Sequence, residues 1–196
     1  MGAGVDDPCF EAVGTRRLRQ LGLSGGRVLV TLRRGTPHGA ALELCAAGAA
    51  VRIAVRDVER LRVGYVEGKA RYYETRLWRG GDARPLTLYP HASNRAAYAR
   101  VVRAAVTAIA DAGRIDHVES GLSRMSALAT PALLAPVALG AAALALFALS
   151  GEPWWGRLIV PVIPTAVFAL TLWLALTRHW PRPIRRPADL DAQLPP

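Results

Sequence analysis

The chain is 196 residues long and carries 25 Lys or Arg against 15 Asp or Glu, a formal net charge of +10. Hydrophobic residues make up 52% of it, and only two residues are cysteine. This composition excludes a small secreted scaffold held together by disulfides, and it indicates one folded domain joined to separate apolar segments.

Residues 1–25 form an N-terminal segment ahead of the first clearly predicted strand. Met1 to Phe10 include Asp6 and Asp7 and lack the basic start and apolar core of a secretory signal. We therefore expect that the following domain is not exported. Part of Phe10–Gly25 is available for an additional strand.

Residues 26–119 are predicted to form the folded domain, which begins with six short segments of β type. The predicted strands are Val28–Arg33, Ala40–Ala46, Ala50–Arg56, Val58–Val66, Ala70–Arg79 and Leu86–Tyr89. Turns that contain glycine separate them, and such short connections favour antiparallel pairing. Within the third segment Val51, Ile53 and Val55 alternate with basic residues, which predicts one face toward a core and one toward water.

A helix is predicted after the last of these strands. Apolar residues recur there at spacings of three and four, namely Tyr98, Val101, Val102, Ala105 and Ile109. Ser93 or Asn94 can cap its first turn, and Gly113 can end it. The helix is expected to cover the core of its own domain, with a membrane surface or a partner as the alternative. Strands followed by one helix predict an α+β domain.

Two apolar runs follow, Ala127–Leu149 and Leu158–Thr177, and neither contains Asp, Glu, Lys, Arg or His. Each reaches the length of about 20 residues that a helix needs to cross a hydrocarbon layer of ~30 Å. Residues 120–126 are predicted to be a linker and residues 150–157 a short periplasmic loop. The two runs are therefore predicted to form a transmembrane hairpin.

Positive charges near the ends of the spans predict the orientation, because Lys and Arg close to a span stay on the cytoplasmic side. Five arginines flank the two spans on the side away from the loop: Arg124, Arg178, Arg182, Arg185 and Arg186. An even number of spans places both termini on one side, so we expect both in the cytoplasm at an inner membrane. The same five arginines are candidate contacts for lipid headgroups.

Residues 178–196 form a basic tail rich in proline and arginine. We expect this tail to be extended or disordered and to fix the topology. The alternative is a linear segment that docks on the domain of its own chain or on a partner.

A bent antiparallel sheet followed by one helix resembles the pleckstrin-homology-like (PH-like) domains of small bacterial membrane proteins. Residues 51–64 carry this resemblance best, because a strand is followed by Asp57 and Arg60 and then by alternating Leu61 and Val63. Residues 152–183 are similar to a group of uncharacterised two-span bacterial inner-membrane proteins. The resemblance implies a bent sheet or partial barrel, usually of seven strands, with one C-terminal helix and a membrane hairpin, and it implies no reaction.

The basic residues of the domain are almost all arginine, whose planar guanidinium matches phosphate. For a domain tethered to a bilayer the nearest phosphates are lipid headgroups, so membrane lipids are the expected partner. The side chains of Arg52, Arg56, Arg60 and Arg62 form a possible basic interaction face. A merely solvated face is the alternative. Nucleic acid is not expected, because acidic residues are interleaved and no groove-reading helix is evident.

Asp116, His117 and Glu119 are the one run that can in principle supply an acid–base pair. A polar linker or a final strand before the membrane is the simpler interpretation. The histidines and cysteines lack metal-ligand spacing, and no phosphate-binding or dinucleotide motif is present, so no cofactor is predicted.

The sequence thus predicts a non-enzymatic membrane protein that presents a PH-like interaction domain at the cytoplasmic face of the inner membrane. Its hairpin can pack against itself, a second copy or another protein. The alternatives are an accessory subunit of a larger membrane complex and, less favoured, a membrane-tethered enzyme.

Overall fold

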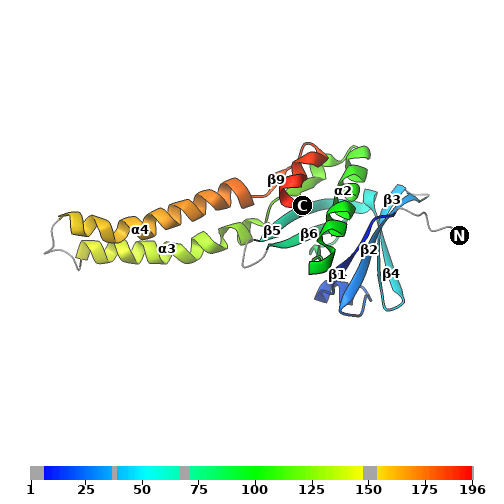
Figure 1. Ribbon diagram of the computed structural model, residues 1–196, viewed down its shortest axis with the longest axis horizontal. Coiled ribbons are helices and arrows are strands. Elements are labelled where there is room, and N and C mark those ends of the chain that lie inside the picture. Colours follow the sequence, from blue (N-terminus) through cyan, green and yellow to red (C-terminus); the bar gives the residue numbers. More distant parts are fainter. Residues whose placement is uncertain (1–6, 37–38, 67–70, 148–153, 196) are drawn as a thin grey trace. The chain divides into compact units, whose positions relative to one another are not determined.

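The chain folds into two units, and the first is built from two stretches that are far apart in sequence (Figure 1). The computed structural model describes residues 7–36, 39–66, 71–147 and 154–195. Unit 1 comprises Met1–Gly121 together with Arg182–Pro196, and unit 2 comprises Leu122–Pro181. We call residues 182–195 the closing segment.

Four strands form the first sheet of unit 1 in sequence order. They are β1 (Cys9–Val13), β2 (Arg27–Thr36), β3 (Gly39–Ala46) and β4 (Ala49–Ala54). All neighbours are antiparallel, and alternate residues such as Val28, Val30 and Leu32 are buried. The short helix α1 (Arg16–Gln20) separates β1 from β2, and the Thr15 side chain caps it. Strand β1 is an additional strand, and it includes the first residues of Phe10–Gly25, where the sequence allowed one.

Five strands form the second sheet, in the order β7-β6-β5-β8-β9. They are β5 (Val58–Val66), β6 (Tyr72–Arg79), β7 (Leu86–Leu88), β8 (Val118–Ser120) and β9 (Arg182–Pro183). A single 3₁₀ turn, η1 (Val55–Asp57), leads from β4 into β5. Strands β5, β6 and β7 are antiparallel, whereas β8 lies parallel to β5 and antiparallel to β9.

Helix α2 (Arg95–Asp111) follows β7 after a 3₁₀ turn, η2 (Ala92–Asn94), and packs on β1, β2 and β3 of the first sheet. The five residues of the predicted apolar stripe are all buried. Tyr98 is the central one: its hydroxyl lies 2.8 Å from Thr75 Oγ1, and its ring meets Phe10 edge to face at 5.2 Å. The mixed α+β class and the antiparallel sheets are confirmed, and the parallel β5–β8 pair is an addition to them.

The closing segment completes the core of unit 1. Three of its apolar side chains, those of Ile184, Leu190 and Leu194, belong to the main hydrophobic cluster, and Leu190 is 0% exposed. A 3₁₀ segment, η5 (Pro187–Gln193), contacts α2, β5 and β8. The Ile184 N–H donates to the Val118 carbonyl at 3.0 Å, and Arg103 pairs with Asp191 at 2.8 Å.

This arrangement corrects the expectation of an extended or disordered tail over residues 178–196, because three buried apolar side chains tie that segment to the core. It agrees with the alternative that the segment docks on the domain of its own chain. The domain also begins earlier than residue 26, with β1, and ends later than residue 119.

Unit 2 consists of helices α3 (Arg124–Phe147) and α4 (Trp154–Leu174), which contact each other, and a π-helical turn, η4 (Ala175–His179). Both helices are long and apolar enough to cross a membrane. Helix α3 begins at Arg124, where the Ser123 hydroxyl accepts the Ser126 N–H, so the connection from β8 is shorter than the predicted linker 120–126. Residues 148–153, which include the predicted end of the first span and the first half of the predicted loop 150–157, lie outside the described residues, as do residues 1–6. The second half of that predicted loop belongs to α4.

Leu190→Ala should destabilise unit 1 by about 2–5 kcal/mol, because it leaves a cavity where a fully buried side chain stood. The free energy of unfolding is measured by native-state hydrogen exchange of the β5 and β8 amides in the full chain. Asp191→Ala is the matched control from the same 3₁₀ segment, since it removes only an exposed ion pair worth about 0–1 kcal/mol. Equal protection in Leu190→Ala and the parent would contradict the packing of the closing segment.

Candidate functional site

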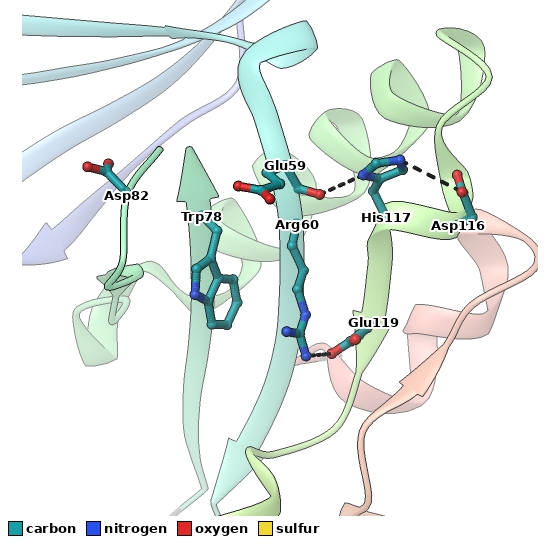
Figure 2. Close-up of a pocket in the computed structure, with 7 residues that line it drawn as sticks. All are labelled: Glu59, Arg60, Trp78, Asp82, Asp116, His117 and Glu119. Atoms are coloured by element: carbon teal, nitrogen blue, oxygen red, sulfur yellow. Dashed lines mark hydrogen bonds and ion pairs between the residues drawn. The ribbon is translucent and has the colours of Figure 1, made fainter. Parts of the chain in front are cut away.

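An open pocket of about 450 Å³ lies along strand β5 of unit 1 (Figure 2). Six of its seven lining residues have a charged or titratable side chain. Its lining residues are Glu59, Arg60, Trp78, Asp82, Asp116, His117 and Glu119. Trp78 and Asp82 lie on one side of Arg60, and the three residues of the 116–119 run lie on the other (Figure 2).

Strand register brings these side chains together. Arg60 lies opposite Trp78 of β6, and Arg62 lies opposite Glu119 of β8. Because Arg60 and Arg62 are two residues apart on β5, both project from the same face of the sheet. A register shift between Val58 and Arg60 marks an irregularity at the start of this strand.

Four side chains form what we call the guanidinium cluster: Arg60, Arg62, Trp78 and Glu119. Arg60 Nη2 and Arg62 Nε each donate to Glu119 Oε2 at 2.8 Å. The two guanidinium groups also lie over the Trp78 ring, 5.0 and 5.3 Å from its centroid. Arg62 is only 6% exposed, so its charge depends on this carboxylate and this ring for the interactions that water would otherwise supply.

The cluster fixes the protonation state of Glu119. Partial burial by itself raises the pKa of this carboxyl, but the hydrogen bonds from Arg60 and Arg62 outweigh burial and hold the pKa below its ordinary value. Glu119 therefore stays ionised at neutral pH and cannot act as a proton donor there.

His117 belongs to a separate set of contacts. Its Nδ1 lies 2.6 Å from the Glu59 carbonyl oxygen, a geometry that needs the proton on Nδ1, and its Nε2 lies 3.7 Å from Asp116 Oδ2. Glu119 faces the two arginines instead (Figure 2). The structure thus brings the predicted trio into one pocket but divides it, and its members do not form a shared acid–base relay.

The remaining acidic groups do not create a metal site. Asp82 pairs with Arg17 at 3.2 Å and with Arg79 at 3.4 Å. Among the residues that the structure describes, no three His, Cys, Asp or Glu side chains are grouped so that they can hold a metal ion.

The four arginines of the predicted basic face fall into two groups. Arg60 and Arg62 lie on β5 in the guanidinium cluster, as described above. Arg52 lies on β4 in the other sheet, 3.7 Å from Glu43, and Arg56 lies in the η1 turn, 3.7 Å from Asp57. Both of these are exposed, whereas Arg62 is buried, so the four do not share one solvated surface.

The five arginines predicted to contact lipid headgroups are all exposed in the chain alone. The Arg124 guanidinium lies 5.7 Å from the centroid of the Trp180 ring, both within unit 2. In unit 1 the backbone N–H groups of Arg185 and Arg186 donate to Asp189 Oδ2 at 3.0 and 2.9 Å. These two bonds lower the pKa of the Asp189 carboxyl and shape the turn that carries both arginines.

Sequence reasoning did not find that Arg62 pairs with Glu119. The two residues are 57 positions apart, and the pairing depends on β8 lying parallel to β5. The only local signal for this pair was the Glu119 carboxylate itself, which lies in a short segment that could form a final strand before the membrane.

Comparisons of the chain with protein-family models, with curated proteins and with solved structures find no match. The likeness to small two-span bacterial membrane proteins therefore stays a prediction. The chemistry of the residues and the path of the chain are the evidence for function.

Glu119→Gln should lower the stability of unit 1 by about 1–3 kcal/mol at pH 7, because it leaves the buried Arg62 charge without its carboxylate. Since the folded-state pKa of Glu119 is depressed, its contribution is complete above the ordinary value of 4.5 and is lost as the pH falls through the lower folded value. The parent should therefore lose stability toward acid more steeply than the variant does.

Urea unfolding at pH 7 and at pH 4 measures the loss of stability and its dependence on pH. Unfolding is followed by the fluorescence of Trp78 in a variant whose other four tryptophans are changed to phenylalanine. Glu59→Gln is the matched control, because Glu59 is exposed in the same pocket and its substitution should change stability by less than about 0.5 kcal/mol. An identical loss in both variants would contradict the role given to the cluster.

Proposed function

We propose that the chain is an integral membrane protein with two spans that holds a PH-like domain at the cytoplasmic face of an inner membrane. The domain serves there as a non-enzymatic interaction module. Five features support this proposal: the exposure of the apolar helices, the path of the chain, the positive charges that flank the helices, the order of the strands, and the chemistry of the charged pocket.

The exposure of α3 and α4 supports a membrane location. In the most apolar 18-residue stretch of each helix, only 17% of α3 and 6% of α4 is buried within the chain. Large apolar side chains such as Leu133, Leu139 and Ile163 are exposed. The core helix of a soluble protein is mostly buried, and an apolar surface of this extent needs lipid or a partner to cover it.

The single observation that carries the proposal is that the closing segment belongs to unit 1. The chain leaves unit 1 at Gly121, runs through both apolar helices and re-enters the same core at Arg182. One folded unit lies on one side of a bilayer, so two helices that cross it must cross in opposite directions. This argues for a pair of spans rather than one span and one surface helix.

The positive charges near the ends of the helices support the proposed side of the membrane. Five exposed arginines flank the helices at the ends joined to unit 1, and by the positive-inside rule they favour a cytoplasmic location for this unit. Each basic group near an anionic leaflet contributes roughly 1 kcal/mol, so the same arginines are proposed to contact lipid headgroups.

The order of elements supports the PH-like interpretation. Strands β1–β4 form one antiparallel sheet, β5–β7 are antiparallel in a second sheet, and α2 follows them. The resemblance implies seven strands followed by one helix, and β1–β7 followed by α2 agree with it. Strands β8 and β9 are additional and lie at the edge of the second sheet.

The charged pocket supports a non-enzymatic role. Its best-placed carboxylate, Glu119, is held ionised by two arginines, and His117 contacts a backbone carbonyl and Asp116 instead of Glu119. Such an arrangement binds β8 to β5 and engages Glu119 with the two arginines and not with His117.

Single-cysteine labelling tests the topology. In a chain with Cys9 and Cys45 changed to serine, we place one cysteine at Arg100, at Asp191 or in the connection between α3 and α4, residues 148–153. A membrane-impermeant maleimide should label the connection in intact cells, and it should label Arg100→Cys and Asp191→Cys only after permeabilisation, because both are exposed residues of unit 1.

Different accessibility of Arg100→Cys and Asp191→Cys would overturn the two-span proposal. Labelling of both in intact cells would overturn the cytoplasmic orientation and leave the pair of spans in place.

Changing the five flanking arginines to glutamine should remove most of the preference for anionic lipid, since each loses a charge worth roughly 1 kcal/mol at an anionic surface. Native mass spectrometry of the full chain, extracted from mixed neutral and anionic liposomes, counts the retained lipids. The control changes five exposed arginines elsewhere, Arg16, Arg19, Arg34, Arg84 and Arg100, and should keep the preference. Equal loss in both variants would refute a specific role for the flanking set.

A further inference from the structure

A cleft of about 340 Å³ lies in unit 1 between the first sheet and the C-terminal half of α2. Arg34 of β2 and Ala40 of β3 line it from the sheet. Four residues line it from the helix: Ala104, Thr107, Ala108 and Asp111. Arg34 and Ala40 continue the alternation of Leu32 and Leu42, which are buried on the face that α2 covers. The cleft therefore lies where the core between the helix and the sheet ends.

Small side chains keep this cleft open. Ala104 and Ala108 are four residues apart on one face of α2, and Ala40 lines the cleft from the sheet, so three methyl groups form its floor. Val101, one turn earlier on the same face of the helix, is 1% exposed and fills the core. The floor is thus apolar, and the space above it is left by the change from valine to alanine along the helix.

Two opposite charges lie on opposite walls of the cleft. The guanidinium of Arg34 belongs to the sheet wall, and the carboxylate of Asp111 belongs to the helix wall. Both residues are exposed, and within the described part of the chain neither has an ion-pair partner. The cleft separates the two groups, so each can bind a charge that comes from solution.

The position of Asp111 favours a cationic group. Asp111 is the last residue of α2, and the last turn of that helix contains no basic residue. The C-terminal end of a helix carries a partial negative charge, so a carboxylate there is unfavourable by itself and attracts a cation. Thr107 lies one turn earlier and donates its hydroxyl hydrogen to the Arg103 carbonyl at 2.9 Å. Its oxygen keeps lone pairs that can accept a hydrogen bond from an ammonium group.

Arg34 supplies the complementary charge, because a guanidinium donates two parallel hydrogen bonds to a carboxylate. A ligand that carries a carboxylate and an ammonium group on one carbon atom can pair with both walls at once. A small apolar substituent on the same carbon atom can lie on the alanine floor. A single carboxylate does not make a site for a hard metal ion, which takes several oxygen ligands.

We propose that this cleft binds a free α-amino acid with a small apolar side chain. The carboxylate of the ligand pairs with Arg34, its ammonium group pairs with Asp111 and Thr107, and its side chain contacts the three alanines. The proposal goes beyond the proposed topology and holds on whichever side of a membrane unit 1 lies.

L-Alanine labelled with ¹³C is the probe, titrated into the full chain in nanodiscs of neutral lipid and followed by ¹³C line broadening. It should bind at least about 10-fold more tightly than propionate, which lacks the ammonium group, and than ethylamine, which lacks the carboxylate. L-Aspartate should also bind more weakly, because its charged side chain meets methyl groups. Equal binding of L-alanine, propionate and ethylamine would overturn the proposal.

Arg34→Gln and Asp111→Asn should each weaken the binding of L-alanine at least about 10-fold. Arg100→Gln is the matched control, exposed on the same helix and outside the cleft, and should change binding by less than about twofold. Asp111→Asn should not weaken the binding of propionate, and Arg34→Gln should not weaken that of ethylamine. Equal loss for all three probes in both variants would indicate a structural effect and would overturn the assigned roles.

Ala108→Leu tests the space itself, because it fills the cleft from a half-buried position and leaves both charges in place. This variant should abolish the binding of L-alanine, and unchanged affinity would overturn the proposal. If Ala108→Leu fails to fold, the two charge variants at exposed positions still decide the question. Cysteine labelling reports topology independently, so failure of this proposal and failure of the proposed membrane topology are distinguishable.

Discussion

Burial of the closing segment in the core of unit 1 is the constraint on which the rest of the structure depends. Leu190 is wholly enclosed, and a buried leucine contributes about 1.5–3 kcal/mol relative to an exposed one. Strand β9 also gives β8 a second neighbour, and β8 holds Glu119 against Arg60 and Arg62. Packing of the closing segment therefore stabilises the guanidinium cluster and the edge of the second sheet. The same packing holds the chain in unit 1 after it returns from α4.

Much of this fold is predictable from the sequence, because its signals are local. Short β-type segments between turns that contain glycine identified β2–β7, the apolar stripe identified α2, and the two uncharged runs identified α3 and α4. The closing segment was predicted to be extended or disordered since prolines and arginines dominate it. Its three buried residues, Ile184, Leu190 and Leu194, are too few and too widely spaced to predict a strand or a helix, so only tertiary packing reveals them.

The sites were less predictable than the elements. Alternation placed Arg60 and Arg62 on one face, but their burial depends on Glu119, which is distant in sequence. Strand β6 gave no clear inward face for a related reason: Tyr73, Thr75 and Leu77 are buried on one side, and Glu74, on the other side, is only 4% exposed and pairs with Arg76 at 3.0 Å. When both faces of a strand are covered, its pattern cannot distinguish them.

The order in which the chain is synthesised gives the shared core a consequence for biogenesis. Residues 9–121 leave the ribosome first, but the side chains that seal their core follow only after both apolar helices have been made. Until then the space that Leu190 fills in the core of unit 1 is empty, and β8 lacks its pairing with β9. A nascent chain stalled or cleaved between the helices thus leaves hydrophobic surface of unit 1 uncovered, and such surface is what chaperones and proteases act on.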